Sequence, residues 1–483
     1  MLKPRARHCL PGLTRREFLK ASALAAGGLA GGSLGCTPGP ILEGIYTDRF
    51  TYRQGQPIRF HGALTSGVPA TVRVRSLDFS HSAWTWDVAF GQAQNRYDPG
   101  MFGAQFEVGL EIDSASLPIG IYEVSIPDAA LEPQNLENTA TKYTHKNNLA
   151  RFVVTAPAPG SHSPILFIYD TGTAISYASF GARSIYGQPP VRGPIVSWLR
   201  PGMNQSQKES PVARFLRQSG HELEYIDPVA LDAQASGFLD SYRLVIALGQ
   251  LEYLSNGLVA ELERYVEAGG NLLCASHEFG VFRVRLDHAS ATHTTFKGDF
   301  PFDPCYGVDD AQLAGVGMLN PAAVFETQPF GQTTLAALRN LPGETRDLTL
   351  ANTADLGWIL QGTGLGDGDV LADALGNFNS GTLVGFDAVG RPFAEPSPYT
   401  RQHPSTVVWG LAPAADAEMW WGTPDANGYL PKMPDGGWAT ATFQQRDSGG
   451  RVVSFPTGGI FRTHLGMAVY EQILLNIVAA LTA

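Results

Sequence analysis

The sequence predicts an N-terminal antiparallel β-sandwich followed by an α/β domain built on a parallel sheet. Three observations support this. Before residue 156, short segments alternate apolar and polar residues. After residue 164, continuous apolar segments alternate with amphipathic helical patterns. Between them lies a Pro- and Gly-rich linker. At 483 residues, the chain is long enough for two or three domains.

Residues 1–36 read as an export signal rather than as part of the fold. Arg15 and Arg16 precede a short run of apolar and small residues, a pattern similar to a twin-arginine signal, which exports folded proteins. The run ends at Cys36, placed like the lipidated cysteine of a lipoprotein, although Ser33 stands where Leu is usual. We expect a periplasmic protein or a lipoprotein attached to the membrane through Cys36. A cleaved signal without an anchor is the alternative.

The charge of the chain limits its partners. The formal net charge is −11. Most of the charged side chains among the first 35 residues are basic, so the net charge of the remaining chain is more negative still. This excess argues against nucleic acid or an anionic membrane face as a partner. Beyond the signal, Cys274 and Cys305 either form one disulfide or stay free, with Cys274 as a small buried residue. The zinc motifs CxxC and HExxH do not occur in the sequence.

The first domain is predicted to span residues 37–156, beginning with a short tether at 37–44. Apolar residues at every second position, with turn residues between the segments, predict antiparallel strands. The segments are PIRFHGAL (57–64), ATVRVRSLDF (70–79), AQFEVGLEI (104–112), IYEVSIP (121–127) and ARFVVTAP (150–157). The linker APAPGSHSP (156–164) follows.

The second domain is predicted to span residues 163–483. Apolar strands are expected at 165–170, 222–227, 242–249 and 271–276. A helix is expected from Ser210 as N-cap to Gly220, and a second with Leu258, Leu262, Tyr265 and Val266 on its buried face. Residues 285–440 are rich in Gly, Pro and Asp and predict an irregular, loop-rich insertion with short strands. A last strand near 451–455 and an amphipathic helix close the domain.

Oxygen-bearing side chains gather where these strands end. Ligands bind at the carboxyl ends of strands in a parallel α/β sheet. The segments that follow the strands supply Tyr177, Tyr186, Gln250, Glu252 and Glu278. Phenolate and carboxylate are hard donors, which suit ferric iron better than zinc. Such an ion would polarise a carbonyl group and activate water.

Four of these segments resemble the large (β) subunit of N,N-dimethylformamidase and its relatives. SYASFGARSIYG (176–187) is similar to their Tyr-Asn-x-Trp-Gly-Gly-x-Ser-Leu-Tyr segment, and the strand and turn ending in GQLEYL (249–254) to their Gly-His-x-Glu-Tyr-Trp turn. FLRQSGHELEYID (215–227) and FPTGGIFRTHLG (455–466) resemble further segments in the same order. The resemblance covers residues 163–285 and 450–483.

The resemblance implies a glutamine-amidotransferase-like, flavodoxin-like α/β domain behind a β-sandwich. It also implies a mononuclear iron held by two tyrosines and a glutamate, where water cleaves a small amide. By motif, Glu252 matches the glutamate and Tyr177 one tyrosine. Tyr186 is the choice for the second tyrosine, with Tyr225 as the alternative.

The sequence departs from the family motif at several positions. Gln250 replaces the family histidine, a candidate proton shuttle, and Glu278 stands where relatives carry Asn. Leu254 and Ala178 replace a Trp and an Asn. Glu252, Gln250 and Glu278 are therefore the candidate catalytic residues, and the loss of the histidine puts amide hydrolysis in question.

Other interpretations of these residues stay open. Glu252 could be a carboxylate at a helix N-terminus, and the two tyrosines could be loop aromatics packing on the sheet. Two functions remain: an exported hydrolase of small amides, and a non-catalytic envelope protein that binds a ligand or a partner. A Ser or Cys nucleophile is disfavoured, because Cys274 falls inside a strand and the one GxSxG match lies in the signal.

Overall fold

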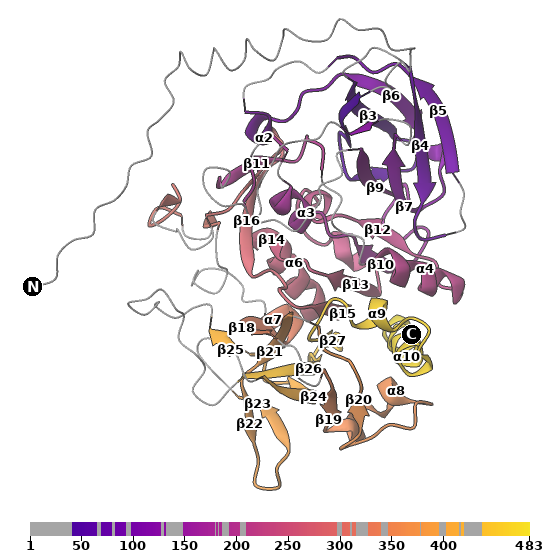
Figure 1. Ribbon diagram of the computed structural model, residues 1–483. Helices are drawn as coiled ribbons and strands as arrows, with labels where there is room; N and C mark the ends of the chain where they lie inside the picture. Colours follow the sequence, from indigo (N-terminus) through magenta and orange to yellow (C-terminus); the bar gives the residue numbers. More distant parts are fainter. Residues whose placement is uncertain are drawn as a thin grey trace, which may run out of the picture. The chain divides into compact units, whose positions relative to one another are not determined.

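The structure is a computed structural model, and its description covers most of the chain from Ile41 onward (Figure 1). The described residues are 41–64, 69–79, 83–92, 98–126, 130–131, 148–178, 180–181, 183–185, 193–202, 209–296, 302–309, 312–314, 327–339, 346–376, 378–395, 402–414, 417–419 and 437–483. The predicted signal, Cys36 and Tyr186 lie outside them.

The N-terminal part contains two largely antiparallel sheets. One has the order β6-β3-β1-β8, with β1 at Ile41–Thr47, β3 at Pro57–Leu64, β6 at Val108–Asp113 and β8 at Ala130–Leu131. The other has the order β2-β9-β7-β4-β5, at Thr51–Arg53, Leu149–Thr155, Gly120–Ser125, Ala70–Ser76 and Ala83–Val88. The short contacts β1–β8 and β2–β9 are parallel.

These two sheets share one hydrophobic core. Phe60 from the first sheet meets Phe152 from the second, with ring centroids 5.8 Å apart, and Val72 and Tyr122 complete the same cluster. Alternate residues of β4 are buried, in agreement with the period-two pattern of its sequence. The prediction of antiparallel sheets is therefore confirmed. Short helical turns α2 (Pro99–Phe102) and η1 (Ser114–Ser116) connect the strands.

The second half is built on a mixed twelve-stranded sheet. Its parallel part has the order β12-β10-β13-β15-β27, at Glu224–Ile226, Ile165–Ile168, Leu244–Gly249, Asn271–Ser276 and Arg451–Phe455. Every residue of β10, β12 and β13 is buried, which explains their continuous apolar sequences.

The same sheet continues antiparallel beyond β27. The next strands are β26 (Gly437–Gln445), β21 (Phe378–Thr382), β18 (Thr333–Arg339) and β25 (Ala417–Met419). Strand β24 (Val407–Ala414) branches from β26 and leads to β19 (Leu348–Leu350) and β20 (Val370–Leu371). The segment predicted as a loop-rich insertion thus supplies much of the sheet. It also contains the short helices α7 (Thr327–Phe330), η6 (Thr353–Leu356) and α8 (Gly357–Leu360), and a separate hairpin of β22 (Val384–Phe386) and β23 (Pro392–Ala394).

Helices cover both faces of the parallel strands. Phe167 and Ile246 share one core cluster with α4 (Ser210–Gln218) and α10 (Ala468–Thr482). Their strand neighbours Leu166 and Val245 share another cluster with α6 (Asn256–Glu267). Shorter helices are α3 (Gly172–Tyr177), α5 (Pro228–Asp232), η2 (Phe238–Ser241) and α9 (Ile460–His464). Within the described residues, no helix has the length and apolar character needed to cross a membrane.

Some local predictions need correction. Ser210 is the first residue of α4 rather than its N-cap; Glu209 holds the N-cap position and makes no side-chain capping bond. Cys274 and Cys305 are both free, and Cys274 is buried in its strand. A small sheet of order β11-β17-β16-β14, at Ile195–Ser197, Thr292–Thr294, Phe282–Asp287 and Tyr253–Ser255, was not predicted, because its mostly three-residue strands are too short to show a period.

Polar contacts join the N-terminal sheets to the parallel sheet. The Tyr225 hydroxyl donates to the buried carboxylate of Asp78, and Arg217 lies 3.6 Å from the same carboxylate. The Thr51 hydroxyl donates to Asp227 over 2.6 Å. Burial raises the pKa of Tyr225 well above its usual value, so the phenol stays protonated and keeps donating.

Candidate functional site

The turn that carries Glu252 is fastened to helix α3. The carboxylate of Asp170, two residues after the end of β10, accepts the Leu251 amide over 3.0 Å and the Thr173 amide over 3.1 Å. The Glu252 amide donates to the Thr173 hydroxyl over 3.2 Å. Leu251 has a φ of 44°, a left-handed conformation that a leucine rarely adopts. Asp170 therefore holds the end of β10 and the bend after β13 together.

Two glycines permit this close packing. A Cβ at Gly172 would lie 2.4 Å from the Tyr253 carbonyl oxygen, so a side chain there would force α3 away from the turn. Gly249, with a φ of 108°, lies against Glu209, whose Oε1 would be 2.0 Å from a Cβ. Glycine is therefore needed at both positions, at Gly172 because of the close approach of main chain and at Gly249 because of its positive φ and the nearby Glu209.

Tyr177 lies beside the residue that follows Glu252. The rings of Tyr177 and Tyr253 meet edge to face, with centroids 6.4 Å apart. Tyr253 also stacks on Phe282 at 5.2 Å. Both Tyr177 and Glu252 are buried, at 5% and 2% exposure. The structure thus brings two of the three candidate iron ligands onto adjacent segments, while the third, Tyr186, lies outside the described residues.

Glu252 lies three residues before the N-cap of helix α6. Helix α6 begins at Asn256 with Ser255 as its N-cap, and its first turn contains no acidic residue. Strand β14 separates Glu252 from this helix. Glu252 is therefore not part of the first turn of this helix. The packing interpretation of Tyr177 stays open, because its ring is part of a hydrophobic cluster.

Gln250 and Glu278 lie at the same edge of the sheet. Gly249 pairs with Ser276 in the parallel register of β13 and β15, so the residues that follow each strand are neighbours. The Ser276 hydroxyl donates to the Gln250 carbonyl over 2.5 Å and accepts the Glu278 amide over 3.4 Å. His277 Nε2 lies 3.6 Å from a carboxylate oxygen of Glu278. This places an acid and an imidazole one strand away from Glu252.

His293 is a buried residue that the sequence analysis missed. It is fully buried on β17, its ring lies 5.8 Å from that of Tyr253, and its Nε2 is 3.2 Å from the Ser176 hydroxyl. Its Nδ1 has no hydrogen-bond partner within the described part of the chain. Burial lowers the pKa of His293 to about 3, so the imidazole is neutral at pH 7. No local pattern marks this histidine, which is 117 residues away from Ser176.

Arg200 supports the loop that follows Tyr177. Its guanidinium donates to four carbonyl oxygens, those of Ile175, Ala178, Phe180 and Arg183, over 2.6 to 3.1 Å. Burial lowers its pKa to about 9. The arginine thus fixes the backbone on both sides of Tyr177, a role that sequence reasoning also missed because the contacts are to main chain.

The described acids, imidazoles and thiols do not form a metal site by themselves. Within the described residues, no three His, Cys, Asp or Glu side chains group in a way that could hold a metal ion. A metal at Glu252 would need further oxygen donors. The phenol identified from the sequence, Tyr177, has its ring centroid 6.4 Å from that of Tyr253, the residue after Glu252. Tyr225 does not serve, because its hydroxyl is committed to Asp78.

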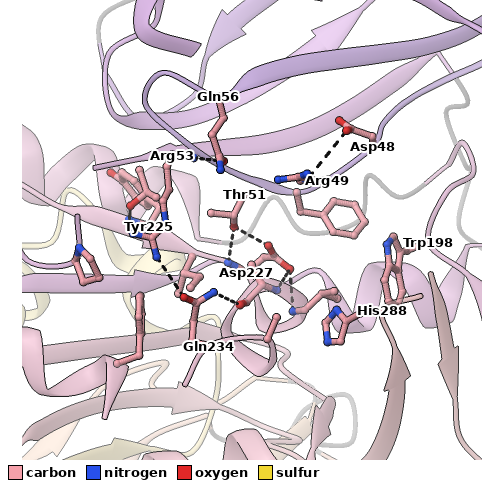
Figure 2. A pocket seen from close by; sticks show the side chains of 18 of the residues that line it. Asp48, Arg49, Thr51, Arg53, Gln56, Trp198, Tyr225, Asp227, Gln234 and His288 are labelled. Atoms are coloured by element: carbon pink, nitrogen blue, oxygen red, sulfur yellow. Dashed lines mark hydrogen bonds and ion pairs between the residues drawn. The ribbon is translucent and has the colours of Figure 1, made fainter. Parts of the chain in front are cut away.

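Two described cavities lie elsewhere on the molecule. One, of about 450 Å³, is lined by Arg49, Trp198, Tyr225, Asp227 and His288 among others (Figure 2). The other, of about 680 Å³, is lined by residues of β11, β16 and β17 and the turn between β16 and β17, together with Met101, Phe102 and Gln312. Glu252, Tyr177, Gln250 and Glu278 line neither of them.

Comparison with known proteins identifies the family. A search of curated proteins finds no match. One solved structure, named mmIFT52 N-terminal domain, is 12% identical, covers 55% of this chain and 87% of its own, and has a TM-score of 0.29, too low to support an argument. Residues 72–428 match the family described as N,N-dimethylformamidase beta subunit-like, C-terminal. Because this match spans well over half of the chain, the protein belongs to the N,N-dimethylformamidase beta subunit-like family.

Proposed function

We propose that the protein is an exported hydrolase that cleaves the carbon–nitrogen bond of a small linear amide. Its centre lies where β10 and β13 end, and Glu252, Tyr177 and Tyr186 are the oxygen ligands of a single iron ion. The observation that carries this proposal is the attachment of α3, which bears Tyr177, to the Glu252 turn through Asp170 and Thr173. Membership of the family supports the hydrolase class.

We also propose a flavodoxin-like, glutamine-amidotransferase-like parallel sheet. Taken in chain order, the five parallel strands lie side by side as second, first, third, fourth and fifth. That order is typical of flavodoxin-like domains, whose ligands bind where the order reverses. The reversal here falls between β10 and β13, the two strands that Asp170 and Glu252 follow.

The chain's own residues have distinct parts in this proposal. Iron, when bound, supplies Lewis acidity toward the amide carbonyl. Glu252 would hold the ion and Tyr177 would add a phenol oxygen, while Asp170 and Arg200 keep the backbone of these two residues fixed. Glu278, next to His277, is the candidate for accepting a proton from water. Gln250 can orient the substrate through its amide, although it cannot replace the acid–base role of a histidine.

A second candidate is a non-catalytic envelope protein that binds a small ligand. Two observations favour it. Gln250 stands where the family motif has a histidine. The 450 Å³ cavity is also separate from the candidate centre, because none of the candidate residues lines it.

Metal content and activity of the purified native protein separate the two candidates. We expect about one iron per chain by elemental analysis, and release of amine from N,N-dimethylformamide. Glu252→Ala should lose the iron and lower activity by more than about a hundredfold, because it removes a direct ligand. Glu222→Ala, at an exposed glutamate, is the matched control and should retain both.

The outcomes are distinct. A Glu252→Ala protein with its full iron content would reject the ligand role of this carboxylate. Native protein without iron and without amidase activity would favour the binding protein. Activity that is retained in Glu278→Gln would exclude Glu278 as the proton acceptor while leaving the metal centre intact.

A further inference from the structure

The 450 Å³ cavity lies between the loop after β1 and the segment that contains β12 and α5. Its wall is formed by residues drawn from the segments 48–56, 155–159, 224–242 and 288–291, together with Trp198 and Leu199 (Figure 2). Small-molecule sites usually have volumes of about 300 to 1,000 Å³. The cavity therefore has the size of a site for a small organic molecule.

Apolar and aromatic side chains form one part of the wall. Phe50, Trp198 and Val229 are largely buried yet border the cavity. The rings of Trp198 and His288 meet edge to face, with centroids 5.8 Å apart. Figure 2 shows these two rings on one side of the cavity and Tyr225 on the other. Such a wall suits a flat aromatic ring, which gains from both burial and ring contacts.

The two most deeply buried acids of the wall already have their partners in the fold. Glu224 accepts the amides of Gly160, His162 and Ser163 and the hydroxyl of Tyr242, over 2.7 to 3.1 Å. Asp227 accepts two amides of α5 and the hydroxyls of Thr51 and Thr171, over 2.6 to 3.2 Å. Each carboxylate already accepts four hydrogen bonds, so neither offers a further acceptor position to a ligand.

Arg49 is the donor that the fold engages least, through one long ion pair with Asp48. Arg53 is engaged, since its guanidinium donates to the Pro157 carbonyl and the Gln234 amide oxygen, each over 3.2 Å. The Arg49 guanidinium makes no hydrogen bond within the described residues, and its nearest acid, Asp48, is 4.0 Å away. Asp48 itself accepts the Tyr52 hydroxyl over 2.5 Å. The side chain of Arg49 is 59% exposed, at the mouth of the cavity.

The geometry points to a binding site for a small aromatic carboxylate in this cavity. The aromatic ring packs against Trp198 and Phe50, and the carboxylate pairs with the Arg49 guanidinium in a two-pronged ion pair. This site is separate from the proposed amidase centre and does not depend on it.

Calorimetric titration of the purified full chain tests the assignment with three matched probes. These are phenylacetate, the neutral 2-phenylethanol and the cationic phenethylamine. We expect one phenylacetate per chain, bound about tenfold more tightly than the alcohol, and weakest binding of the amine. Arg49→Gln should weaken phenylacetate binding about tenfold and leave the alcohol unchanged. Arg59→Gln, at another exposed arginine on the N-terminal sheets, is the control and should bind as wild type.

A second variant tests the location of the site. Ala230 is a half-buried wall residue, and Ala230→Leu should fill part of the cavity and abolish binding of both the acid and the alcohol. Glu252→Gln should bind phenylacetate as wild type does. Equal affinity for the acid and the alcohol, unchanged binding in Arg49→Gln, or loss of binding in Glu252→Gln would each overturn the assignment.

Discussion

His293 is a fully buried histidine whose charge state is fixed by its surroundings. Burial is the main cause of its lowered pKa, and the nearby Arg200 disfavours a second positive charge. Its pKa is about 3 in the folded protein, against 6.5 for an exposed histidine. Between these values the unfolded chain binds a proton on this residue and the folded chain does not.

The pH dependence of stability should reflect this difference. The contribution of His293 is present above pH 6.5 and is lost as the pH falls toward 3, by at most about 1.4 kcal/mol per pH unit. We expect urea unfolding of His293→Gln to lose less stability than the wild type between pH 7.5 and pH 4.5. His162→Gln, at an exposed histidine, should behave as wild type. Parallel stability profiles for wild type and His293→Gln would contradict this prediction.

Residues of the candidate site differ in how far the sequence reveals them. Tyr177, Gln250, Glu252 and Glu278 follow predicted strands or stand in recognisable motifs, so the sequence alone selects them. His293 and Arg200 come from the small sheet or its border and contact the site through long-range packing. Neither a periodic pattern nor a motif reveals such contacts, because they depend on the packing of segments that are far apart in the sequence.

At the level of elements, the contact between α3 and the Glu252 turn depends on a glycine at position 172. Gly172 lets the first turn of α3 approach the Tyr253 carbonyl oxygen. A methyl group there would have to displace main chain rather than a flexible side chain. The position of Tyr177, five residues along the same helix, follows from this approach.

Gly172→Ala should therefore disturb the site as well as the fold. We expect a loss of about 1 to 3 kcal/mol in the free energy of unfolding, as for overpacking in a core. Iron content should fall with it, if Tyr177 is a ligand. Gly257→Ala is the matched control, because a Cβ there meets only ordinary contacts in helix α6, and alanine favours a helix. Chemical denaturation and elemental analysis of both variants provide the measurements; equal effects of the two changes would refute the special role of Gly172.

Elements with strong local signals could be predicted from the sequence. The strand at 244–249 and the helix at 256–267 lie where their apolar patterns predict them. The strands between 333 and 445 are less visible, because Gly and Pro interrupt them and their neighbours are far away in the chain. Antiparallel additions such as β18 and β21 are defined by pairing, which a local pattern does not contain.

At the scale of the whole molecule, we propose that residues 1–36 are an export signal that decides where the protein acts. In this proposal, Arg15 and Arg16 are the pair that the twin-arginine route would recognise. We expect the double variant Arg15→Lys with Arg16→Lys to stay inside the cell, as seen by fractionation and immunoblotting. Arg5→Lys with Arg7→Lys preserves the same charges outside the motif and should be exported. Normal export of the first variant would show that another route is used.

The position of β27 has a consequence for synthesis on the ribosome. This strand lies in the interior of the sheet, between β15 and β26, although residues 451–455 are made after every other strand. Until residues 451–455 leave the ribosomal exit tunnel, β15 and β26 lack their shared neighbour and remain open sheet edges. Open edges promote aggregation. Translation that stalls before residue 451 should therefore yield a substrate for proteases rather than a partly active fragment.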